Sequence, residues 1–430
     1  MAVVAPSGRR GHRVMEAPRA SVVIPNWDGR TLLEECLSAV LASDTDGGLE
    51  VIVIDNGSTD GSADMVRRRF PRVLVERNDA NHGFAAACNQ GARMASAASV
   101  AFLNNDARVG QGWLEPLLDT LGTEADVAAV GSLVLSADGR TIDFGRAGLT
   151  PLARGTQLDF GRPAEEAPDR PTELLFANGA AMLVRRDVFL EVGGFDERFF
   201  AYYEDVDLGW RYWLLGWRLM LQPASRVFHR HHGTSRRLRK EQVDFLLTRN
   251  AIASAVKNTE DATFARLIPI LLLGETARLV ADVGRPDRYH VPGFGRFAFR
   301  QPPEPSMATA IRQRVGGEAL RAYRHESTLR SRLARTIDRR LDPGGARLSA
   351  GAGAVTAALE EVLWGWPQLM TSRAAIQAGR RRADREIAAL FGLDRQRRHR
   401  RRDAIAPDES REAVFRALEA ADLDWLLPTG

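Results

Sequence analysis

The sequence predicts an α/β fold with a mostly parallel, doubly wound sheet, followed by a mainly α-helical C-terminal extension. Over the first 235 residues, short apolar runs alternate with segments of helical periodicity. The early runs end in polar residues, and beyond residue 235 the pattern becomes helical. Strands that are apolar on both faces and separated by helices are typical of parallel sheets, which bind ligands at the carboxyl ends of their strands.

The strands of this sheet are predicted from continuous apolar runs at residues 20–25, 50–55, 73–76 and 100–103. Between the first two runs, Leu33, Cys36, Leu37 and Val40 recur at the spacing of a helix, and an alanine-rich helix is expected over 84–97. The polar residues that follow the strands then lie on one edge of the sheet. They are Asn26, Asp28, Asp55, Asn56, Asn81 and Asp106.

The remaining sequence divides the chain into segments. Residues 136–170 are rich in glycine, proline and charge, which predicts loops or a hairpin, and 174–184 predicts a further strand. Helices are expected over 242–258 and 262–283. The expected organisation is a disordered leader over 1–18, the α/β domain over 19–235, a helical extension over 236–300, a linker and helix over 301–345, and a C-terminal helical region over 346–430.

Composition excludes several classes of protein. The charges nearly balance, with 59 Lys and Arg against 55 Asp and Glu, so the net charge of +4 indicates no particular partner. The two cysteines, Cys36 and Cys88, are far apart, which argues against a disulfide framework and fits a reducing cytosol. The longest apolar run, 267–273, is shorter than the roughly 18 residues of a membrane span and contains Pro269. We therefore expect a cytoplasmic protein.

The segment VIVIDNGSTDGS (51–62) brings Asp55 to the carboxyl end of a buried strand. A carboxylate there can accept hydrogen bonds from a base N–H or a ribose hydroxyl. Ser58, Thr59 and Asp60 can cap the helix that follows. A plain strand-to-helix turn with good capping chemistry remains an equal alternative, since capping residues are common in loops.

The segment FLNNDA (102–107) ends a strand on Asn104, Asn105 and Asp106. Oxygen ligands of this kind suit a hard cation, Mg²⁺ or Mn²⁺. Such a cation would bridge a diphosphate and neutralise charge on the leaving group. One carboxylate alone is a weak metal site, so the diphosphate and a further side chain must complete it, and a turn or helix cap remains the alternative.

The segment GGFDERFFAYYEDVDLGWR (193–211) places aromatic residues directly before Glu204, Asp205 and Asp207. A partly apolar pocket raises the pKa of a carboxyl group enough for base catalysis. On a helix that starts near Glu204, the carboxylates also lie at the favourable end of the helix dipole. An acidic helix start with a solvated face is the alternative, and the aromatic run argues against it.

Residues 227–235 (VFHRHHGTS) contain His229, His231 and His232. No cysteine lies nearby and the spacing matches no structural zinc site. We favour a role for one of these histidines as a single metal ligand, or as a positive group near a diphosphate, over a histidine-rich loop that has no ligand role. The sequence has no Walker A loop, no GxSxG elbow and no GxGxxG after the first strand. It therefore lacks the motifs on which the chemistry of kinases, hydrolases and dehydrogenases depends.

Together these segments resemble the family 2 inverting glycosyltransferases, and within them the bacterial rhamnosyltransferase-like branch. The resemblance implies the GT-A fold, a Rossmann-like α/β architecture. It covers about 215 residues and rests on seven blocks in the family's order: SVVIPNWDG (21–29), VIVIDNGSTDGS (51–62), NHGFAAACNQG (81–91), FLNNDA (102–107), NGAAMLVRR (178–186), GGFDERFFAYYEDVDLGWR (193–211) and HRHHGTS (229–235).

The resemblance also implies roles for individual residues. Asp205 matches the catalytic base that deprotonates the acceptor hydroxyl for in-line attack at the anomeric carbon, and Glu204 and Asp207 would support it. Asp106 matches the last position of the family's metal-binding DxD-like motif, from which this sequence departs by carrying Asn104 and Asn105. His229 lies where some members supply a ligand to the metal or the diphosphate. The residues implied for nucleotide-sugar binding are Pro25, Asn26, Asp55, Asn56, Ser58, Asn81, Gly83, Asn89, Asn105 and Arg211.

The implied function is transfer of a hexose or deoxyhexose, with inversion, from a UDP- or dTDP-sugar such as dTDP-rhamnose to a glycan or lipid-linked acceptor in cell-envelope polysaccharide or glycoconjugate synthesis. Mg²⁺ or Mn²⁺ would be the cofactor. One alternative is a catalytically inactive nucleotide- or glycan-binding protein on the same fold. The presence of Asp55, Asp106 and Asp205 together argues against this alternative. A nucleotidyltransferase would need a Gly- and Lys/Arg-rich loop after the first strand, which PNWDGRTL (25–32) does not resemble.

Residues 373–402 contain eleven arginines against three acidic residues. One interpretation is peripheral docking to anionic lipid headgroups at the inner face of the cell membrane. A solvated helical face or a homodimer contact is slightly favoured over it. Nucleic-acid binding is not expected, because no aromatic interleaving or known module accompanies the charges.

Overall fold

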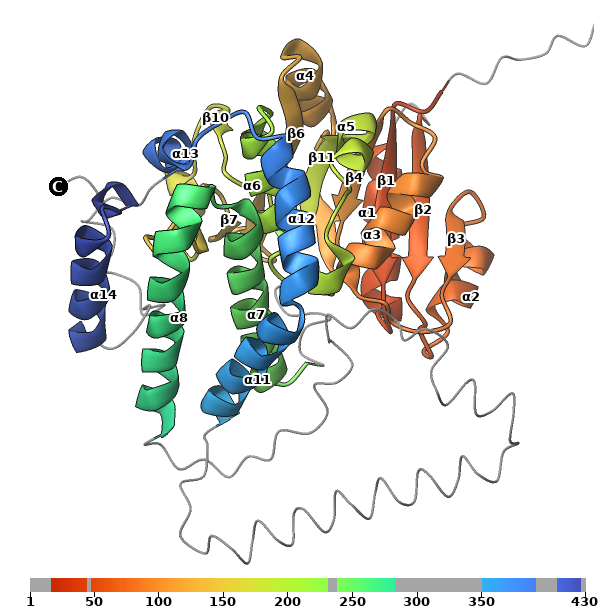
Figure 1. The fold of residues 1–430 in the computed structure, drawn as a ribbon. Coiled ribbons are helices and arrows are strands. Elements are labelled where there is room, and N and C mark those ends of the chain that lie inside the picture. The colour runs from red at the N-terminus through yellow and green to blue at the C-terminus, as the bar shows by residue number, and fades with distance from the viewer. Residues whose placement is uncertain (1–16, 45–47, 231–237, 284–349, 392–407, 427–430) are drawn as a thin grey trace, which may run out of the picture.

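The structure is a computed structural model that describes residues 17–44, 48–230, 238–283, 350–391 and 408–426. Within these residues an α/β domain, formed by the first half of the chain, lies beside a group of helices formed by the second half (Figure 1). The predicted fold class is confirmed, because the sheet is mixed but mostly parallel and the C-terminal part is helical.

The main sheet consists of β1 (Ala20–Asn26), β2 (Leu49–Asp55), β3 (Leu74–Arg77), β4 (Ser99–Leu103), β6 (Val127–Ser136), β10 (Thr172–Glu173), β11 (Ala181–Arg185) and β12 (Arg218–His229), with β5 (Ala107–Val109) on β12 and β7 (Ile142–Phe144) on β6. Their order is β10-β12-β6-β11-β4-β1-β2-β3. A separate hairpin pairs β8 (Ala147–Leu149) with β9 (Gly155–Gln157).

Strands β1, β2, β3 and β4 run parallel, as the buried apolar runs predict. In this register Asn26 pairs with Asp55, so the polar ends of β1 and β2 lie side by side. Strand β11 runs antiparallel to both of its neighbours, β4 and β6. A mixed sheet of this kind still presents the carboxyl ends of its parallel strands at one edge.

The strand predicted over 174–184 is shorter than expected, since only β11 forms in it. The preceding residues leave the sheet because α6 (Glu204–Leu214) packs directly on them. Trp213 Nε1 donates to Leu174 O at 2.9 Å, and a Cβ at Gly209 would lie 2.5 Å from Leu175 O. This close approach fixes the start of α6 relative to the sheet.

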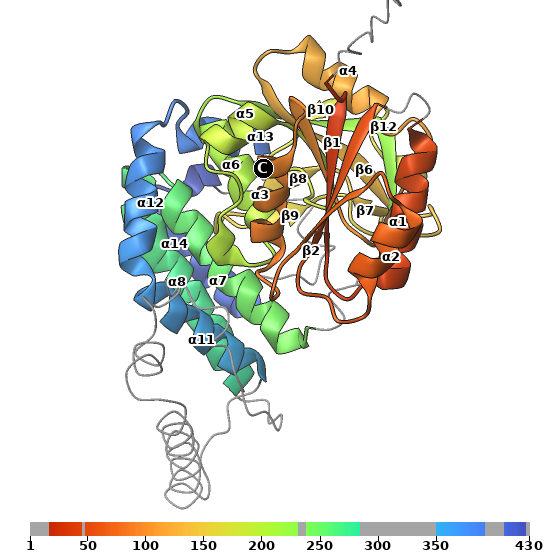
Figure 2. The ribbon, with the colours of Figure 1, turned by 90° about the vertical axis from the view of Figure 1, so that its right-hand side faces the viewer.

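The helices of the α/β domain cover both faces of the sheet. They are α1 (Arg30–Ser43), α2 (Ser62–Arg69), α3 (Phe84–Met94), α4 (Glu115–Thr123), α5 (Arg186–Glu191) and α6. Figure 2 shows α1 and α2 on one side of the sheet and α3, α5 and α6 on the other. The face of α1 predicted from helical spacing, with Leu33, Cys36, Leu37 and Val40, is buried against the sheet.

The second half of the chain forms α7 (Lys240–Asn258), α8 (Asp261–Val283), α11 (Ala350–Trp364), α12 (Trp366–Ala378), α13 (Asp384–Phe391) and α14 (Asp408–Ala420). The helices predicted over 242–258 and 262–283 are therefore confirmed. Figure 1 shows α7, α8, α11 and α12 packed side by side, with α7 next to α6. The predicted leader over 1–18 lies almost wholly outside the described residues, as does the linker over 301–345.

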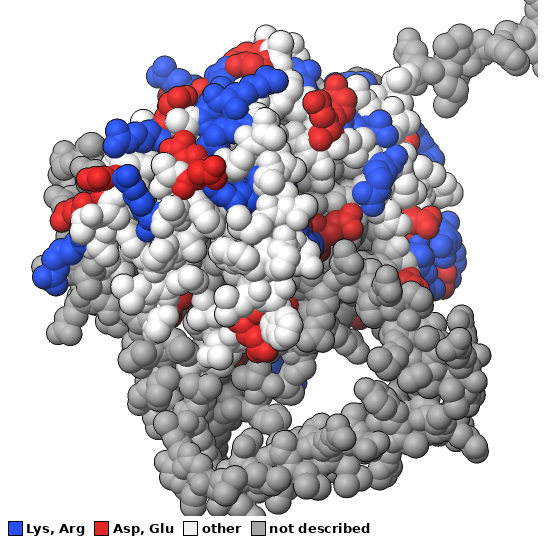
Figure 3. Space-filling view, viewed as in Figure 1, with Lys and Arg blue, Asp and Glu red and all other residues white. Residues whose placement is uncertain are grey.

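The basic segment 373–402 is partly used for internal contacts. Arg373 is 3% exposed and donates to Val256 O at 2.8 Å, while Arg382 donates to Trp217 O at 3.1 Å and Arg380 to Asp384 at 3.1 Å. In Figure 3 the surface over α8 and α12 is largely uncharged, and the basic groups above it are mixed with acidic ones. Within the described part of the chain, no helix combines the length and hydropathy that crossing a bilayer requires.

Candidate active site

A cavity of about 990 Å³ lies at the carboxyl ends of β1 and β4, between the first turn of α6 and the β8–β9 hairpin. It is lined by side chains from β1, the first strand in the chain, and from β12, the last. The predicted site residues that line it are Pro25, Asn26, Asn56, Asn81, Gly83, Asn105, Asp106, Glu204, Asp205 and His229.

The end of the cavity at β1 and β2 is built from a network of amides. Asn26 Nδ2 donates to Asp55 Oδ1 at 3.3 Å and to Ser58 Oγ at 3.2 Å. Asn105 Nδ2 donates to Asn26 Oδ1 at 2.7 Å. Asp55 is fully buried, and its second oxygen lies 3.5 Å from Arg77 Nε. Asp55 and Ser58 therefore lie one contact behind the cavity wall, where they fix Asn26.

Asn56 extends this network to the segment before α3. Its Nδ2 donates to Asn81 Oδ1 at 2.9 Å and to Gly83 O at 3.0 Å. Gly83 has a φ of +93°, and a Cβ at this position would lie 2.5 Å from Phe200 O. Both the backbone conformation and the close approach require glycine here. The main chain at Gly83 thus touches the loop that leads into α6.

Another part of the cavity wall contains a histidine that lies between two carboxylates. His229 Nε2 lies 3.0 Å from Asp106 Oδ1, and His229 Nδ1 lies 2.8 Å from Asp143 Oδ2. Burial opposes a charge on this imidazole, but the hydrogen bonds and charges of Asp106 and Asp143 outweigh it and raise the pKa of His229 to about 10. Asp143 is a site residue that sequence reasoning misses, because it lies in a segment without a recognisable motif.

Glu204 and Asp205 form the start of α6 and face the cavity. Asp205 Oδ2 accepts a hydrogen bond from Gly179 N at 3.2 Å, and its Oδ1 accepts one from Val206 N at 2.8 Å. Glu204 is 7% exposed, and its Oε2 accepts no hydrogen bond from the described residues. Burial raises the pKa of both carboxyl groups, and the charge of Asp205 raises that of Glu204 further.

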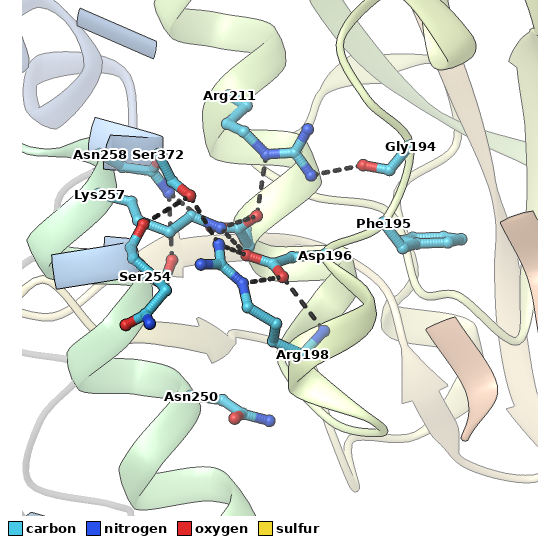
Figure 4. Close-up of polar contacts among 12 residues, drawn as sticks. Gly194, Phe195, Asp196, Arg198, Arg211, Asn250, Ser254, Lys257, Asn258 and Ser372 are labelled. Atoms are coloured by element: carbon cyan, nitrogen blue, oxygen red, sulfur yellow. Dashed lines mark hydrogen bonds and ion pairs between the residues drawn. The ribbon is translucent and has the colours of Figure 1, made fainter. Parts of the chain in front are cut away.

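Besides Asp55 and Ser58, three further predicted site residues do not line the cavity. Asn89 Nδ2 donates to Phe195 O at 2.8 Å, and its Oδ1 accepts from Phe195 N at 2.9 Å, so Asn89 holds the turn before α6. Asp207 and Arg211 pair with each other at 2.9 Å within α6, and Arg211 also donates to Gly194 O at 2.6 Å (Figure 4). All three side chains are buried and bind groups of the protein.

Asp207 belongs to a buried ion network that reaches into the helical extension. Lys257 on α7 is 2% exposed, and its Nζ lies 2.6 Å from Asp196 Oδ2 (Figure 4). The same Nζ lies 2.9 Å from Asp207 Oδ1. Asn258 Nδ2 donates to Asp207 Oδ1 at 3.0 Å. Sequence reasoning misses Lys257 because a lysine in an amphipathic helix is typical of a solvated face. The network ties the first turn of α6 to α7.

A mostly parallel α/β sheet, with carboxylates gathered at its strand ends and at the start of a helix, is the arrangement expected of a glycosyltransferase of the GT-A type. Residues 21–193 match the family described as Glycosyl transferase family 2. The chain belongs to this family.

Several relatives share the same region of the chain. It is 34% identical over 224 residues to the N-acetylglucosaminyl-diphospho-decaprenol L-rhamnosyltransferase of Mycobacterium tuberculosis, a match that covers 46% of this chain and 72% of that protein. It is 30% identical over 238 residues to the O-antigen biosynthesis protein RfbC of Myxococcus xanthus, covering 52% of this chain and 18% of that one. Among solved structures, GalNAc-T7 with UDP, GalNAc and Mn²⁺ aligns with a TM-score of 0.48 at 18% identity, over 60% of this chain and 52% of that one.

Proposed function

We propose that this glycosyltransferase moves a hexose or deoxyhexose from a UDP- or dTDP-sugar to a glycan or lipid-linked acceptor, with inversion at the anomeric carbon. The observation that carries the proposal is the half-buried carboxylate of Asp205, which lines the same cavity as the amides of Asn26 and Asn56. The similarity to an L-rhamnosyltransferase makes a dTDP-rhamnose donor the first candidate to test.

The chemistry follows from the environment of Asp205. Its carboxylate takes the proton of the acceptor hydroxyl while that oxygen attacks the anomeric carbon, and the nucleoside diphosphate departs from the opposite face. Burial raises the pKa of Asp205, which makes its ionised form a better proton acceptor than an exposed aspartate. Gly179 N–H and Val206 N–H keep the carboxylate oriented while it is ionised.

The donor diphosphate must enter a cavity whose described lining is acidic. The lining carboxylates are Asp106, Glu204, Asp205 and Asp244. Two side chains of the described lining carry positive charge, and both are already paired: Arg154 with Glu275, and His229 with Asp106 and Asp143. A dianionic leaving group in such a cavity requires an added cation.

Asp106 and His229 fit a divalent cation. Asp106 would supply a carboxylate oxygen, and His229 would supply Nε2, 3.0 Å from it, once the cation has displaced the proton from this nitrogen. The other ring nitrogen of His229 lies on Asp143, which is how a carboxylate orients a histidine ligand. When bound, Mg²⁺ or Mn²⁺ would neutralise the charge of the departing diphosphate.

The experiment is a transfer and donor-hydrolysis assay with purified protein, Mn²⁺ and a panel of nucleotide sugars. Thermal-shift measurements against the same panel identify the donor, because stabilisation grows with the ratio of ligand concentration to Kd. We expect Asp205→Asn to abolish turnover and to leave the nucleotide-induced thermal shift nearly unchanged. Binding without turnover of any donor by the wild-type protein would favour the inactive binding protein instead.

Asp187→Asn is the matched control. Asp187 lies in the first turn of α5 and accepts a hydrogen bond from Val188 N at 2.8 Å, the same local contact that Asp205 makes with Val206. It is exposed and does not line the cavity. Turnover equal to wild type in Asp205→Asn would refute the base, and equal losses in both variants would point to a general effect of the substitution.

A further inference from the structure

The loop that leads into α6 has an unusual backbone. Phe200, Tyr202 and Tyr203 have φ values of 67°, 66° and 74°, and none of them is glycine. Side chains with a Cβ adopt this left-handed region only where the surrounding structure holds them in it. Glu204 and Asp205 follow directly, so the conformation of this loop sets the position of both carboxylates.

Asn250 on α7 holds the loop from one side. Its Nδ2 lies 3.1 Å from Phe199 O, 3.0 Å from Ala201 O and 2.7 Å from Tyr202 O. Asn250 is fully buried, and its Oδ1 accepts a hydrogen bond from Arg249 Nε at 2.9 Å. This second contact fixes which end of the amide faces the loop, so the N–H groups are the ones that meet the three carbonyls.

The other side of the loop rests on α3. Ala85 N donates to Phe200 O at 3.2 Å, at the place where a Cβ on Gly83 would lie 2.5 Å from the same oxygen. The loop is therefore held between the segment that carries the amide network and the helical extension. Removal of either support releases backbone strain at residues 200–203.

We propose that Asn250 is a positioning residue for catalysis, which holds the left-handed loop 200–203 and thereby places Asp205 against the acceptor. The inference rests on the proposed role of Asp205 as the base. Asn250 does not line the cavity, and it acts through the main-chain carbonyls of Phe199, Ala201 and Tyr202. The helical extension thus contributes directly to the geometry of the active site.

The first test measures the loop itself and needs no activity. Phe200, Tyr202 and Tyr203 are aromatic, so chymotrypsin reports local opening of the loop by cleavage after them. Asn250→Asp replaces the N–H donors with a carboxylate of equal size. We expect chymotrypsin to cleave within 200–203 about tenfold faster in this variant, because the loss of one to two net hydrogen bonds raises the equilibrium constant for local opening by about that factor. Mass spectrometry maps the cleavage sites.

Gln377→Glu is the matched control. Gln377 Nε2 on α12 donates to the main-chain carbonyl of Lys257 at 3.0 Å, so the substitution removes the same kind of contact from the same helical extension without touching the loop. We expect wild-type cleavage rates after Phe200, Tyr202 and Tyr203 in this variant. Equal cleavage in Asn250→Asp and Gln377→Glu would overturn the proposal.

The second test measures catalysis. We expect kcat of Asn250→Asp to fall about 100-fold, the scale of an ångström-sized misplacement, while Kd for the donor nucleotide changes less than about threefold. As pH is lowered, the introduced carboxyl group at 250 becomes protonated and can donate to one carbonyl, so the ratio of variant to wild-type kcat should rise. A structural role alone would not produce this pH trend.

The outcomes are distinguishable. A wild-type protein without transferase activity removes the proposed function and leaves the proteolysis test standing. Faster loop cleavage with unchanged kcat refutes positioning. Asn250→Ser keeps one hydroxyl donor and is measured alongside. If neither Asn250→Asp nor Asn250→Ser folds, Asn250 is a residue of the fold in general and the proposal falls.

Discussion

Replacing Lys257 with methionine tests the buried ion network most directly. The substitution keeps the length of the side chain and removes the ammonium group, which lies 2.6 Å from Asp196 and 2.9 Å from Asp207. Both carboxylates stay buried after the change, since Asp207 is 0% exposed and the Asp196 side chain is 10% exposed.

The magnitude follows from what each carboxylate retains. Removing one partner of a buried ion pair costs about 3–5 kcal/mol of stability. Asp207 keeps Arg211 at 2.9 Å, and Asp196 keeps Arg198 at 2.6 Å, so neither is left without a cation. We therefore expect Lys257→Met to lower the free energy of unfolding by about 3 kcal/mol, at the lower end of that range.

The assay is urea unfolding at neutral pH, with Lys240→Met as the control. Lys240 lies on the same helix and pairs with Asp244 at 2.7 Å, but its side chain is 85% exposed, so this loss should stay below about 0.5 kcal/mol. Equal effects of the two substitutions would refute the reasoning.

The pH dependence gives a second check. Burial alone would raise the pKa of Asp196, but Lys257 and Arg198 outweigh it and hold this pKa well below its usual range. A carboxyl group whose pKa is depressed in the folded state stabilises the fold at pH values above its unfolded-state pKa, which is near 4. This stabilisation is lost as the pH falls from the unfolded-state pKa through the folded-state pKa. The stability difference between wild type and Lys257→Met should therefore shrink as the pH falls below about 4.

Three further substitutions test the site. Glu204→Gln should raise the melting temperature, and by more as the pH rises above about 4.3, because the raised pKa of buried Glu204 makes its ionisation destabilise the folded state. A difference in melting temperature that does not change with pH would contradict this. Gly83→Ala should lower stability by more than about 1 kcal/mol, measured by thermal unfolding, because its φ is +93° and Phe200 O blocks a Cβ. Asp143→Asn removes the carboxylate from His229 Nδ1, so the Mn²⁺ concentration for half-maximal activity should rise about 10- to 100-fold. A metal titration measures this concentration, and an unchanged value would exclude His229 as a ligand.

The sheet and part of the site can be predicted from sequence because the information is local. The runs that form β1, β2 and β4 are apolar on both faces, and the aromatic approach to Asp205 lies within one contiguous segment. The direction of β11 cannot be predicted this way, because an apolar run has the same composition whether its strand runs parallel or antiparallel to its neighbours.

Asp143, Asn250 and Lys257 escape prediction for a different reason. Asp143 meets His229 across 86 positions, and Lys257 meets Asp196 across 61. Each residue on its own is typical of a loop or of a solvated helix. Arg373 shows the reverse case, since a charge run suggests a surface, while this side chain is 3% exposed and donates to main-chain carbonyls.

The ion network also orders events during synthesis. The last strand of the sheet ends at His229, but the cation for Asp196 and Asp207 is residue 257, and the guanidinium that holds the end of α7 is residue 373. At about 5–20 residues per second, the ribosome delivers Arg373 roughly 7–30 s after His229. Until residue 257 is synthesised, α6 lacks its lysine counter-charge, and until residue 373 is synthesised, the end of α7 lacks the guanidinium that holds it. A chain released before Arg373 is therefore expected to hold a completed sheet but an incompletely held α7, so prematurely terminated products should be more sensitive to proteolysis than the full chain.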